Sequence, residues 1–304
     1  MKLLRRMLPA LLAASVLLVA ASCAGRPAGE LGTEIIEAKA VAALLAQTGT
    51  VLVDTRAMPD YSEGHVSGAV NISRADIVVN QPFPNLLAPA AQIEQVMGSR
   101  GIGNDTLVVI YDNAKNMDAA RLWWTLKIYG HDKVKVVSGG WEAMKKSGYK
   151  IDAERPALPI ASFKAGALRS EMIITAADLR AALNEPRPEL AIIDTRTEEE
   201  YMEGTIPGSV LIDYVGNNFA DNTYKPVTHI RIKYLEAGIG YDKEIVMFCK
   251  TSIRGAQTYL ALYNAGYRNL KLYDGAWVEW SANPMNPVFV PEPEVLELKV
   301  SDQS

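Results

Sequence analysis

The sequence predicts an α/β fold that occurs twice, as two tandem domains that each contain a mainly parallel sheet flanked by helices. Three observations support this prediction. The 304 residues are 49% hydrophobic and 22% charged, which is enough apolar material for about two ordinary domains. One set of motifs recurs at a nearly constant offset. Within each copy, short apolar runs alternate with longer helical patterns, as is typical of parallel sheets covered by helices.

The N-terminal segment predicts export. Basic residues precede an apolar run over residues 7–21, and small residues then lead into Cys23. This order is typical of a secretory signal, and the run is too short for a membrane-spanning helix, which needs about 20 residues. A cysteine directly after small residues resembles a bacterial lipoprotein signal. We predict a signal peptide over residues 1–22, acylation of Cys23 and a tether over residues 23–33; the alternative is an ordinary cleaved signal.

Composition narrows the location and the partners. We expect a periplasmic or cell-envelope lipoprotein that contacts the membrane only through its lipid anchor. Ala24, directly after the acylated cysteine, favours the outer membrane over the inner membrane. The net charge is -4 and no long basic stretch follows the first few residues, which argues against nucleic acid as a partner. Two cysteines and three scattered histidines argue against a disulfide-dense scaffold and a structural metal site.

The rest of the chain contains an internal repeat. The Val-Leu-Val-Asp-Thr-Arg run around Asp54 recurs as Ala-Ile-Ile-Asp-Thr-Arg around Asp194, 140 residues later. Residues 108–112 match residues 245–249 at an offset of 137. The small drift indicates short loop deletions in the second copy. We infer a tandem duplication.

Each copy alternates strands and helices. Short apolar runs indicate strands buried on both faces at residues 107–111, 134–137, 190–193 and 245–248. Helical patterns cover residues 38–47, 90–100, 119–129, 176–183 and 255–265. Two prolines interrupt any regular period between the copies. The predicted divisions are domain 1 at 34–151, a linker at 152–168, domain 2 at 169–290 and a C-terminal tail at 291–304.

The candidate reactive residue is Cys249, which directly follows the predicted strand 245–248. Chemistry in parallel sheets is usually found beyond the carboxyl ends of the strands, where helix N-termini direct free N–H groups. A loop wound around the sulfur, with nearby cationic side chains, would favour thiolate over thiol. The alternative is a small buried apolar residue. The predicted active loop consists of Lys250, Thr251, Ser252, Ile253 and Arg254.

The motifs form one ordered set. Both copies contain Asp-Thr-Arg, at residues 54–56 and 194–196, and a glycine-bounded segment follows each, at residues 64–69 and 204–209. Tyr-Asp-Gly-Ala-Trp follows at residues 273–277. In this order and spacing the chain resembles the tandem-domain rhodaneses, a family of sulfurtransferases. The resemblance implies two rhodanese-like domains, no cofactor and a reactive cysteine in the second copy.

The resemblance also implies that the first copy is non-catalytic. Two-domain members often have an aspartate in place of the reactive cysteine there, and Asp112 stands opposite Cys249. A carboxylate cannot take up a sulfane sulfur. For Asp194 and Arg196 we prefer a supporting role, in which the Asp side chain bonds turn N–H groups and the Arg pairs with a nearby carboxylate.

The implied reaction is a double displacement through a Cys249 persulfide. A small anionic donor such as thiosulfate supplies the sulfur, and a thiol or cyanide acceptor removes it. Lys250 and Arg254 are candidate anchors for the donor. Two departures from the family leave the donor open: the family's Arg-bearing insertion after the second Asp-x-Arg motif is missing, and Thr205 stands where His is usual.

Two other classes of function are compatible with parts of this pattern. Phosphatases of this fold need five residues between Cys and Arg, whereas four separate Cys249 from Arg254, so a phosphatase is disfavoured. The remaining alternative is a non-catalytic sulfur-carrier or binding lipoprotein, which the missing donor arginine supports. Turnover of free thiosulfate would distinguish a carrier from an enzyme.

Overall fold

A computed structural model describes residues 32–185 and 187–292. Both copies lie in one compact unit of the described chain. The predicted signal peptide, Cys23 and most of the C-terminal tail lie outside the described residues. In the described part of the chain, no helix has the length and apolar character needed to cross a membrane.

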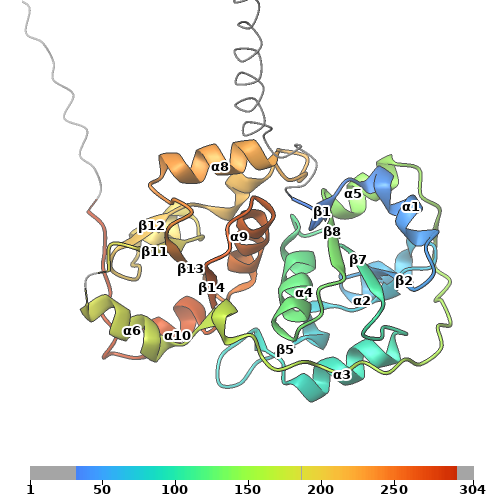
Figure 1. Cartoon of the computed structure of the whole chain (residues 1–304), viewed down its shortest axis with the longest axis horizontal. Coiled ribbons are helices and arrows are strands. Elements are labelled where there is room, and N and C mark those ends of the chain that lie inside the picture. The colour runs from blue at the N-terminus through green and yellow to red at the C-terminus, as the bar shows by residue number, and fades with distance from the viewer. Residues whose placement is uncertain (1–31, 186, 293–304) are drawn as a thin grey trace, which may run out of the picture. The chain divides into compact units, whose positions relative to one another are not determined.

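The first copy is organised around a five-stranded parallel sheet of order β1-β8-β7-β2-β4 (Figure 1). Its strands are β1 (Ile35–Ile36), β2 (Thr50–Asp54), β4 (Val70–Asn71), β7 (Leu107–Tyr111) and β8 (Val134–Val137). The central strands are buried along almost their whole length, because helices cover both faces.

The second copy repeats this topology in a sheet of order β10-β14-β13-β11-β12, again parallel throughout. Its strands are β10 (Ile173–Ile174), β11 (Leu190–Asp194), β12 (Ser209–Leu211), β13 (Glu244–Phe248) and β14 (Leu270–Tyr273). The predicted α/β class and duplication are therefore confirmed.

Helices and 3-10 turns connect the strands. The first copy has η1 (Ala38–Ala40), α1 (Val41–Leu45), α2 (Met58–Glu63), η2 (Arg74–Asp76), α3 (Ala90–Ser99), α4 (Met117–Ile128) and α5 (Gly140–Lys146). The second has η3 (Ser170–Met172), α6 (Ala176–Asn184), α7 (Glu198–Met202), η4 (Tyr214–Asn217), α8 (Val227–Glu236), α9 (Ile253–Asn264) and α10 (Ala276–Ala282).

The helix predicted over residues 38–47 is wrong in detail. It is divided into η1 and the short α1, which ends at Leu45. Gly49, with φ +82°, then turns the chain into β2. A glycine adopts this left-handed conformation without the steric cost of a Cβ atom, so the chain reverses there instead of extending the helix.

Helices α4 and α9 pack against each other between the two sheets (Figure 1). Each has twelve residues, and they begin 136 residues apart. Trp123 of α4 contacts Tyr259 and Tyr263 of α9, with ring centroids 6.1 and 5.3 Å apart. The second copy covers the outer face of α4, and residues 119–128 are all buried, including three polar ones. This interface thus buries charged groups that an isolated amphipathic helix would leave in water.

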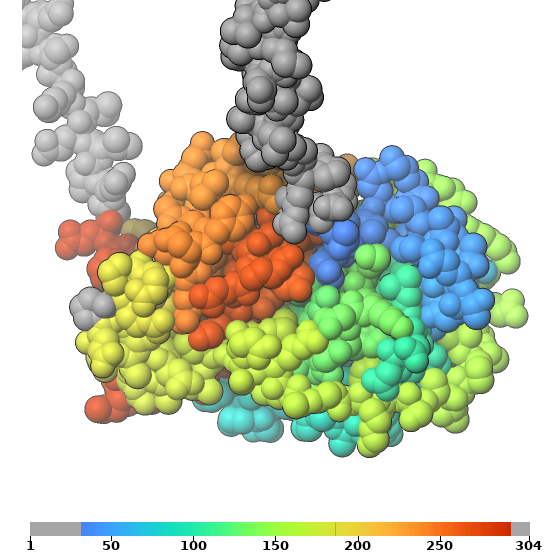
Figure 2. Space-filling view, viewed as in Figure 1, coloured from blue at the N-terminus to red at the C-terminus, as the bar shows by residue number. Residues whose placement is uncertain are grey.

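The linker lies on the surface of the first copy, where it is visible as yellow-green atoms along the lower side of Figure 2. The Ala161 N–H donates to the carbonyl of Gly98 at 3.0 Å, and the Gly166 N–H donates to that of Tyr129 at 2.8 Å. Residues 153–168 contain no helix or strand. Two short antiparallel sheets of two strands each complete the fold: β3 (His65–Val66) with β9 (Ile151–Asp152), and β5 (Val78–Val79) with β6 (Leu86–Leu87), which form a hairpin.

Candidate functional site

Cys249 lies at the carboxyl edge of the second sheet, directly after β13. Its residue is only 1% exposed. The Trp277 N–H, at the start of α10, donates to the Cys249 carbonyl at 2.9 Å. Ser252 then adopts φ 64° and leads into α9 at Ile253. The structure therefore places the loop at the predicted strand end, but α9 begins two residues earlier than predicted, so Ile253 and Arg254 lie in its first turn and not in the loop.

The matching loop of the first copy encloses a carboxylate. Both oxygens of Asp112 accept hydrogen bonds from backbone N–H groups at 2.9–3.2 Å, donated by Ala114, Asn116, Asp118 and Ala119. Burial raises the pKa of Asp112 to about 7, and these backbone donors limit the rise. A loop of this shape is built to hold a negatively charged group at its centre.

The second loop has donors at matching positions. Because α4 and α9 begin 136 residues apart, three of the four N–H groups correspond to those of Ser252, Arg254 and Gly255. In the described part of the chain, the Cys249 sulfur accepts no hydrogen bond from these three N–H groups. The second loop is one residue shorter than the first.

Arg254 is held by Glu200 of α7. Its Nη1 and Nη2 atoms bind the two carboxylate oxygens at 2.5 and 2.8 Å. Hydrogen bonding from Arg254 lowers the pKa of Glu200 to about 2. Burial lowers the pKa of Arg254, but hydrogen bonding to Glu200 and the charge of Cys249 outweigh it and raise that pKa. Arg254 therefore lies beside the thiol with its charge already paired.

Lys250 has a different environment. Its side chain is exposed, and within the described chain it has no ion pair or side-chain hydrogen bond. Thr251 accepts a hydrogen bond from Asn85 of the first copy at 3.1 Å. Of the two predicted anchors, Lys250 is the one whose charge remains available to an anionic donor.

Asp194 and Arg196 form a buried ion pair at the turn after β11, with Nη2 to Oδ2 at 2.6 Å. Arg196 also donates to the Gly204 carbonyl at 2.6 Å, and its guanidinium stacks over the Trp277 ring at 4.5 Å. The backbone N–H of Arg196 donates to Asp194 at 3.0 Å. These contacts hold the turn after β11, and the supporting role of Asp194 and Arg196 stays a prediction.

Thr205 has a structural explanation. In the first copy, the Tyr111 hydroxyl donates to Asp54 at 2.7 Å. The residue paired with Asp194 on the neighbouring strand is Phe248, which has no hydroxyl. Thr205 supplies the missing bond, with its Oγ1 donating to Asp194 at 2.8 Å. The change from the family's usual histidine thus keeps a buried carboxylate satisfied.

Comparison with known proteins identifies the fold. The model of the Rhodanese-like domain family matches the chain twice, at residues 37–147 and 175–283. The chain belongs to the rhodanese-like family. Each matched segment contains four of the five strands of one sheet, so the chain has two family domains in tandem.

Two relatives of this chain are named as sulfurtransferases. Thiosulfate sulfurtransferase of Azotobacter vinelandii is 31% identical over 263 residues, covering 84% of this chain and 96% of that protein. 3-Mercaptopyruvate sulfurtransferase of Escherichia coli K12 is 27% identical over 250 residues, covering 77% and 88%. An anaerobic ergothioneine biosynthesis enzyme from Chlorobium limicola shares the fold, with a TM-score of 0.76, 20% identity and coverage of 86% and 71%.

Sequence reasoning missed residues that lie near the reactive loop of this rhodanese. Glu200, one of three consecutive glutamates at residues 198–200, was not singled out from the sequence. Tyr214 is buried near Cys249, and burial raises its pKa, as does the nearby charge of Cys249. Arg121 of the first copy bonds Ser252 at 2.9 Å. A local signal existed for Arg121, since an arginine between apolar residues and two tryptophans is unusual for a solvated helix face.

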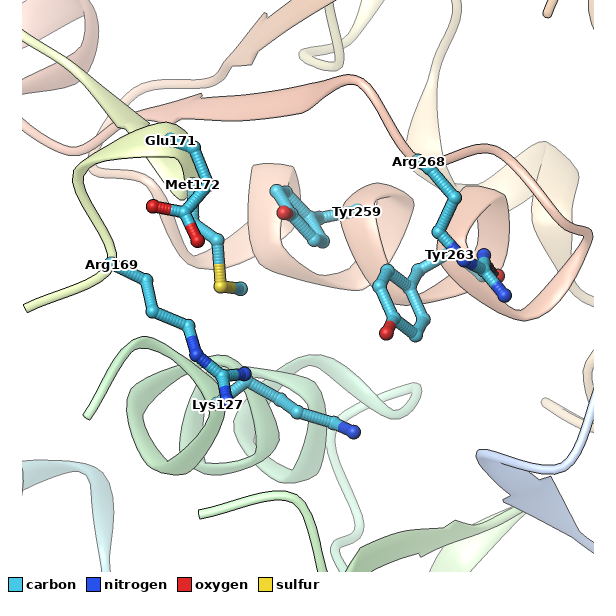
Figure 3. Close-up of a pocket in the computed structure, with 7 residues that line it drawn as sticks. All are labelled: Lys127, Arg169, Glu171, Met172, Tyr259, Tyr263 and Arg268. Carbon is cyan, nitrogen blue, oxygen red and sulfur yellow. Dashed lines mark hydrogen bonds between the residues drawn. The ribbon is translucent and has the colours of Figure 1, made fainter. Parts of the chain in front are cut away.

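A cavity of about 150 Å³ lies elsewhere on the molecule (Figure 3). It is lined by Lys127, Arg169, Glu171, Met172, Tyr259, Tyr263 and Arg268. Its cations are already engaged: Lys127 and Arg169 both pair with Asp132, and Arg268 donates to the Tyr263 and Tyr267 carbonyls. The lining does not include Cys249, so we do not assign the reaction to this cavity.

Proposed function

We propose that this rhodanese transfers a sulfane sulfur from thiosulfate or a related anionic donor to a thiol or cyanide acceptor, through a persulfide on Cys249. The loop geometry is the observation that supports this reaction. Where the first copy holds the Asp112 carboxylate with four backbone N–H groups, the second copy has Cys249. A persulfide anion formed there would meet matching N–H donors and a helix N-terminus.

The proposed steps conserve atoms and electrons. The Cys249 thiolate attacks the outer sulfur of thiosulfate, a new S–S bond forms, and sulfite leaves with the electron pair of the broken bond. The acceptor thiolate or cyanide then attacks the outer sulfur of the persulfide. The Cys249 thiolate leaves with the electrons of the S–S bond, which restores the enzyme.

The charges around the loop suggest a division of roles. Arg254 is paired with Glu200, so it acts on the charge of the sulfur rather than as a free anchor for a donor. Lys250 is exposed and offers the donor its positive charge. The second copy alone carries the thiol, and the first copy serves as its support.

The decisive experiment measures the persulfide directly. We expect one added sulfur on the Cys249 peptide by mass spectrometry after incubation with thiosulfate. Cys249→Ser should retain the fold and lose both the adduct and turnover, because a hydroxyl cannot form a persulfide. Asp112→Ala, a change in the matching loop of the first copy, should form the adduct at the wild-type rate per folded molecule. Substantial turnover by Cys249→Ser would refute the proposal.

The second candidate is a sulfur carrier without turnover of its own. The near-complete burial of Cys249 favours it, since a free donor must displace side chains to reach the sulfur. A carrier would accept sulfur from a protein or low-molecular-weight persulfide in stoichiometric amounts, yet show no steady-state formation of sulfite from thiosulfate. Sulfite release over many turnovers would exclude this candidate.

We also propose export and acylation at Cys23, on the sequence of residues 1–23 alone. The expected product begins with a diacylated or triacylated Cys23 and fractionates with the outer membrane. N-terminal mass spectrometry of the mature protein tests this. A mature N-terminus at another residue, or an unmodified Cys23, would contradict the proposed acylation and indicate an ordinary cleaved signal.

A further inference from the structure

We propose that Arg121, which belongs to the first copy, is a positioning residue for the reactive loop of the second copy; this inference rests on the proposed function. Arg121 lies on α4 and is fully buried. Its Nη1 donates to Ser252 Oγ at 2.9 Å and to Asp274 Oδ1 at 2.7 Å, and its Nη2 donates to the Asn85 carbonyl at 2.9 Å. One side chain therefore connects both copies to the loop.

Ser252 is the residue through which Arg121 would act. It stands three positions after Cys249, with φ 64°, a left-handed conformation that residues with a Cβ seldom adopt. Its hydroxyl also donates to Asp274 Oδ1 at 3.1 Å. Arg121, Ser252 and Asp274 thus form a closed set of three hydrogen bonds that holds the turn between the cysteine and α9.

The first copy reaches the loop at a second point. Asn85, between β5 and β6, donates to Thr251 Oγ1 at 3.1 Å. The Leu87 N–H donates to Asp274 Oδ2 at 2.7 Å. Because Asn85 is itself bound by Arg121, the hairpin and the arginine act as one support for the loop.

The first copy's own loop lacks this device. The residue of α9 that corresponds to Arg121, 136 positions later, is Gln257, which bonds Asn217 and Asn218. The counterpart of Asp274 is Ser138, whose hydroxyl accepts from the Tyr224 N–H. A buried charged pair is costly to place in the interior without compensation. The Arg121–Asp274 pair lies beside the loop that carries the thiol, whereas the corresponding residues, Gln257 and Ser138, carry no charge.

The test uses Arg121→Met in the full chain, with Lys127→Met as the matched control. Lys127 is another buried cation of α4, and its partners Glu34 and Asp132 lie away from the loop. We expect Arg121→Met to lower kcat about 10- to 100-fold with little change in KM, because a misplaced sulfur reacts slowly. Lys127→Met should keep the wild-type kcat. Equal losses in both variants would overturn the proposal.

Arg121→Met leaves Asp274 buried without its partner, so a second set of variants protects the test against misfolding. Arg121→Met/Asp274→Asn removes both charges, and its circular dichroism should match wild type. Ser252→Gly keeps the left-handed turn without the hydroxyl. If Arg121 acts through Ser252, the fold-loss in kcat caused by Arg121→Met should be at least threefold smaller in the Ser252→Gly background than in the wild-type background. Additive losses would mean that Arg121 acts elsewhere.

A separate readout does not depend on sulfur transfer. The rate of alkylation of Cys249 by iodoacetamide, followed on its peptide by mass spectrometry, reports the placement of the thiol itself. We expect Arg121→Met to change this rate at least fivefold and Lys127→Met to leave it unchanged. If wild-type protein transferred no sulfur but this difference held, the proposed function would fail and the positioning role would stand.

Discussion

Buried carboxylates at the two Asp-Thr-Arg turns show how residues compensate for one another. Asp54 and Asp194 each pair with an arginine, and each accepts one more hydroxyl bond. That hydroxyl belongs to Tyr111 in the first copy and to Thr205 in the second. A buried carboxylate oxygen without a hydrogen-bond donor lowers stability by about 1–3 kcal/mol. The Thr205 hydroxyl therefore takes in the second copy the place that the Tyr111 hydroxyl has in the first.

A stability prediction follows at this site. Thr205→Val should lower the free energy of unfolding by about 1–3 kcal/mol, because Asp194 loses a buried donor. Thr205→Val/Phe248→Tyr should recover at least half of the loss, since a tyrosine at 248 stands where Tyr111 stands beside Asp54. Urea unfolding at neutral pH measures both. No recovery in the double variant would show that Thr205 acts by packing.

Lys250 supports a prediction about the donor. Its exposed charge should attract thiosulfate more than an uncharged persulfide, whereas the charge of Arg254 is taken by Glu200. Lys250→Ala should therefore lower kcat/KM about 3- to 10-fold for thiosulfate and by a smaller factor for the uncharged donor. Added salt should reduce the difference between these two losses, because it screens the charge of Lys250. For Arg254→Ala, the losses in kcat/KM with the two donors should differ less than they do for Lys250→Ala. Equal losses for both donors in Lys250→Ala would assign Lys250 to shaping the loop.

At the scale of elements, Glu200 joins α7 to α9. It completes the capping box of α7 with Thr197 and binds Arg254 in the first turn of α9. A partly buried bidentate pair of this kind stabilises more than an exposed ion pair, because solvent screens it less. The start of α9 is thereby tied to α7, close to Cys249.

The Glu200 pair predicts a pH-dependent stability. Its folded-state pKa of about 2 lies below the ordinary value of 4.5, so its contribution is present above pH 4.5 and is lost as the pH falls towards 2. With allowance for its partial exposure, we expect Glu200→Gln to cost on the order of 2 kcal/mol at pH 7. Urea unfolding of both proteins should show the cost falling by about half near pH 3. A constant difference between pH 7 and pH 3 would contradict this assignment.

At the scale of the whole molecule, both copies contribute to one continuous core. Trp123 and Leu122 of the first copy belong to the same buried hydrophobic cluster as Tyr259 and Leu260 of the second. The interface between α4 and α9 is therefore an interior rather than a contact between two finished domains. Separation of the copies would expose aromatic and aliphatic surface that each needs to bury.

This shared core predicts cooperative unfolding. Leu122→Ala creates a cavity on α4 and should cost about 2–5 kcal/mol. We expect a single unfolding transition at a lower urea concentration, with faster hydrogen exchange in β13 of the second copy as well as in β7. Two separate transitions, or wild-type protection of β13, would show that the copies are independent domains.

Much of the fold was accessible from local patterns. Leu107–Tyr111 and Val134–Val137 coincide with their predicted strands, and the predicted helices of 90–100 and 255–265 agree with α3 and α9 to within two residues. The first helix was overextended because its apolar pattern continues past Leu45, where the chain turns. The roles assigned to Cys249 and its loop remain predictions, now with a described geometry.

The sequence by itself determined the duplication, the parallel α/β sheets and the place of Cys249 between a strand and a helix, because periodicity and motif spacing are properties of neighbouring residues. Only the tertiary structure decided which charges meet at the loop. Glu200 lies 54 residues from Arg254, and Arg121 lies 131 residues from Ser252. The contact of Glu200 depends on how α7 lies beside α9, and that of Arg121 on how α4 packs on α9. Both arrangements arise from the burial of the whole fold rather than from any local pattern.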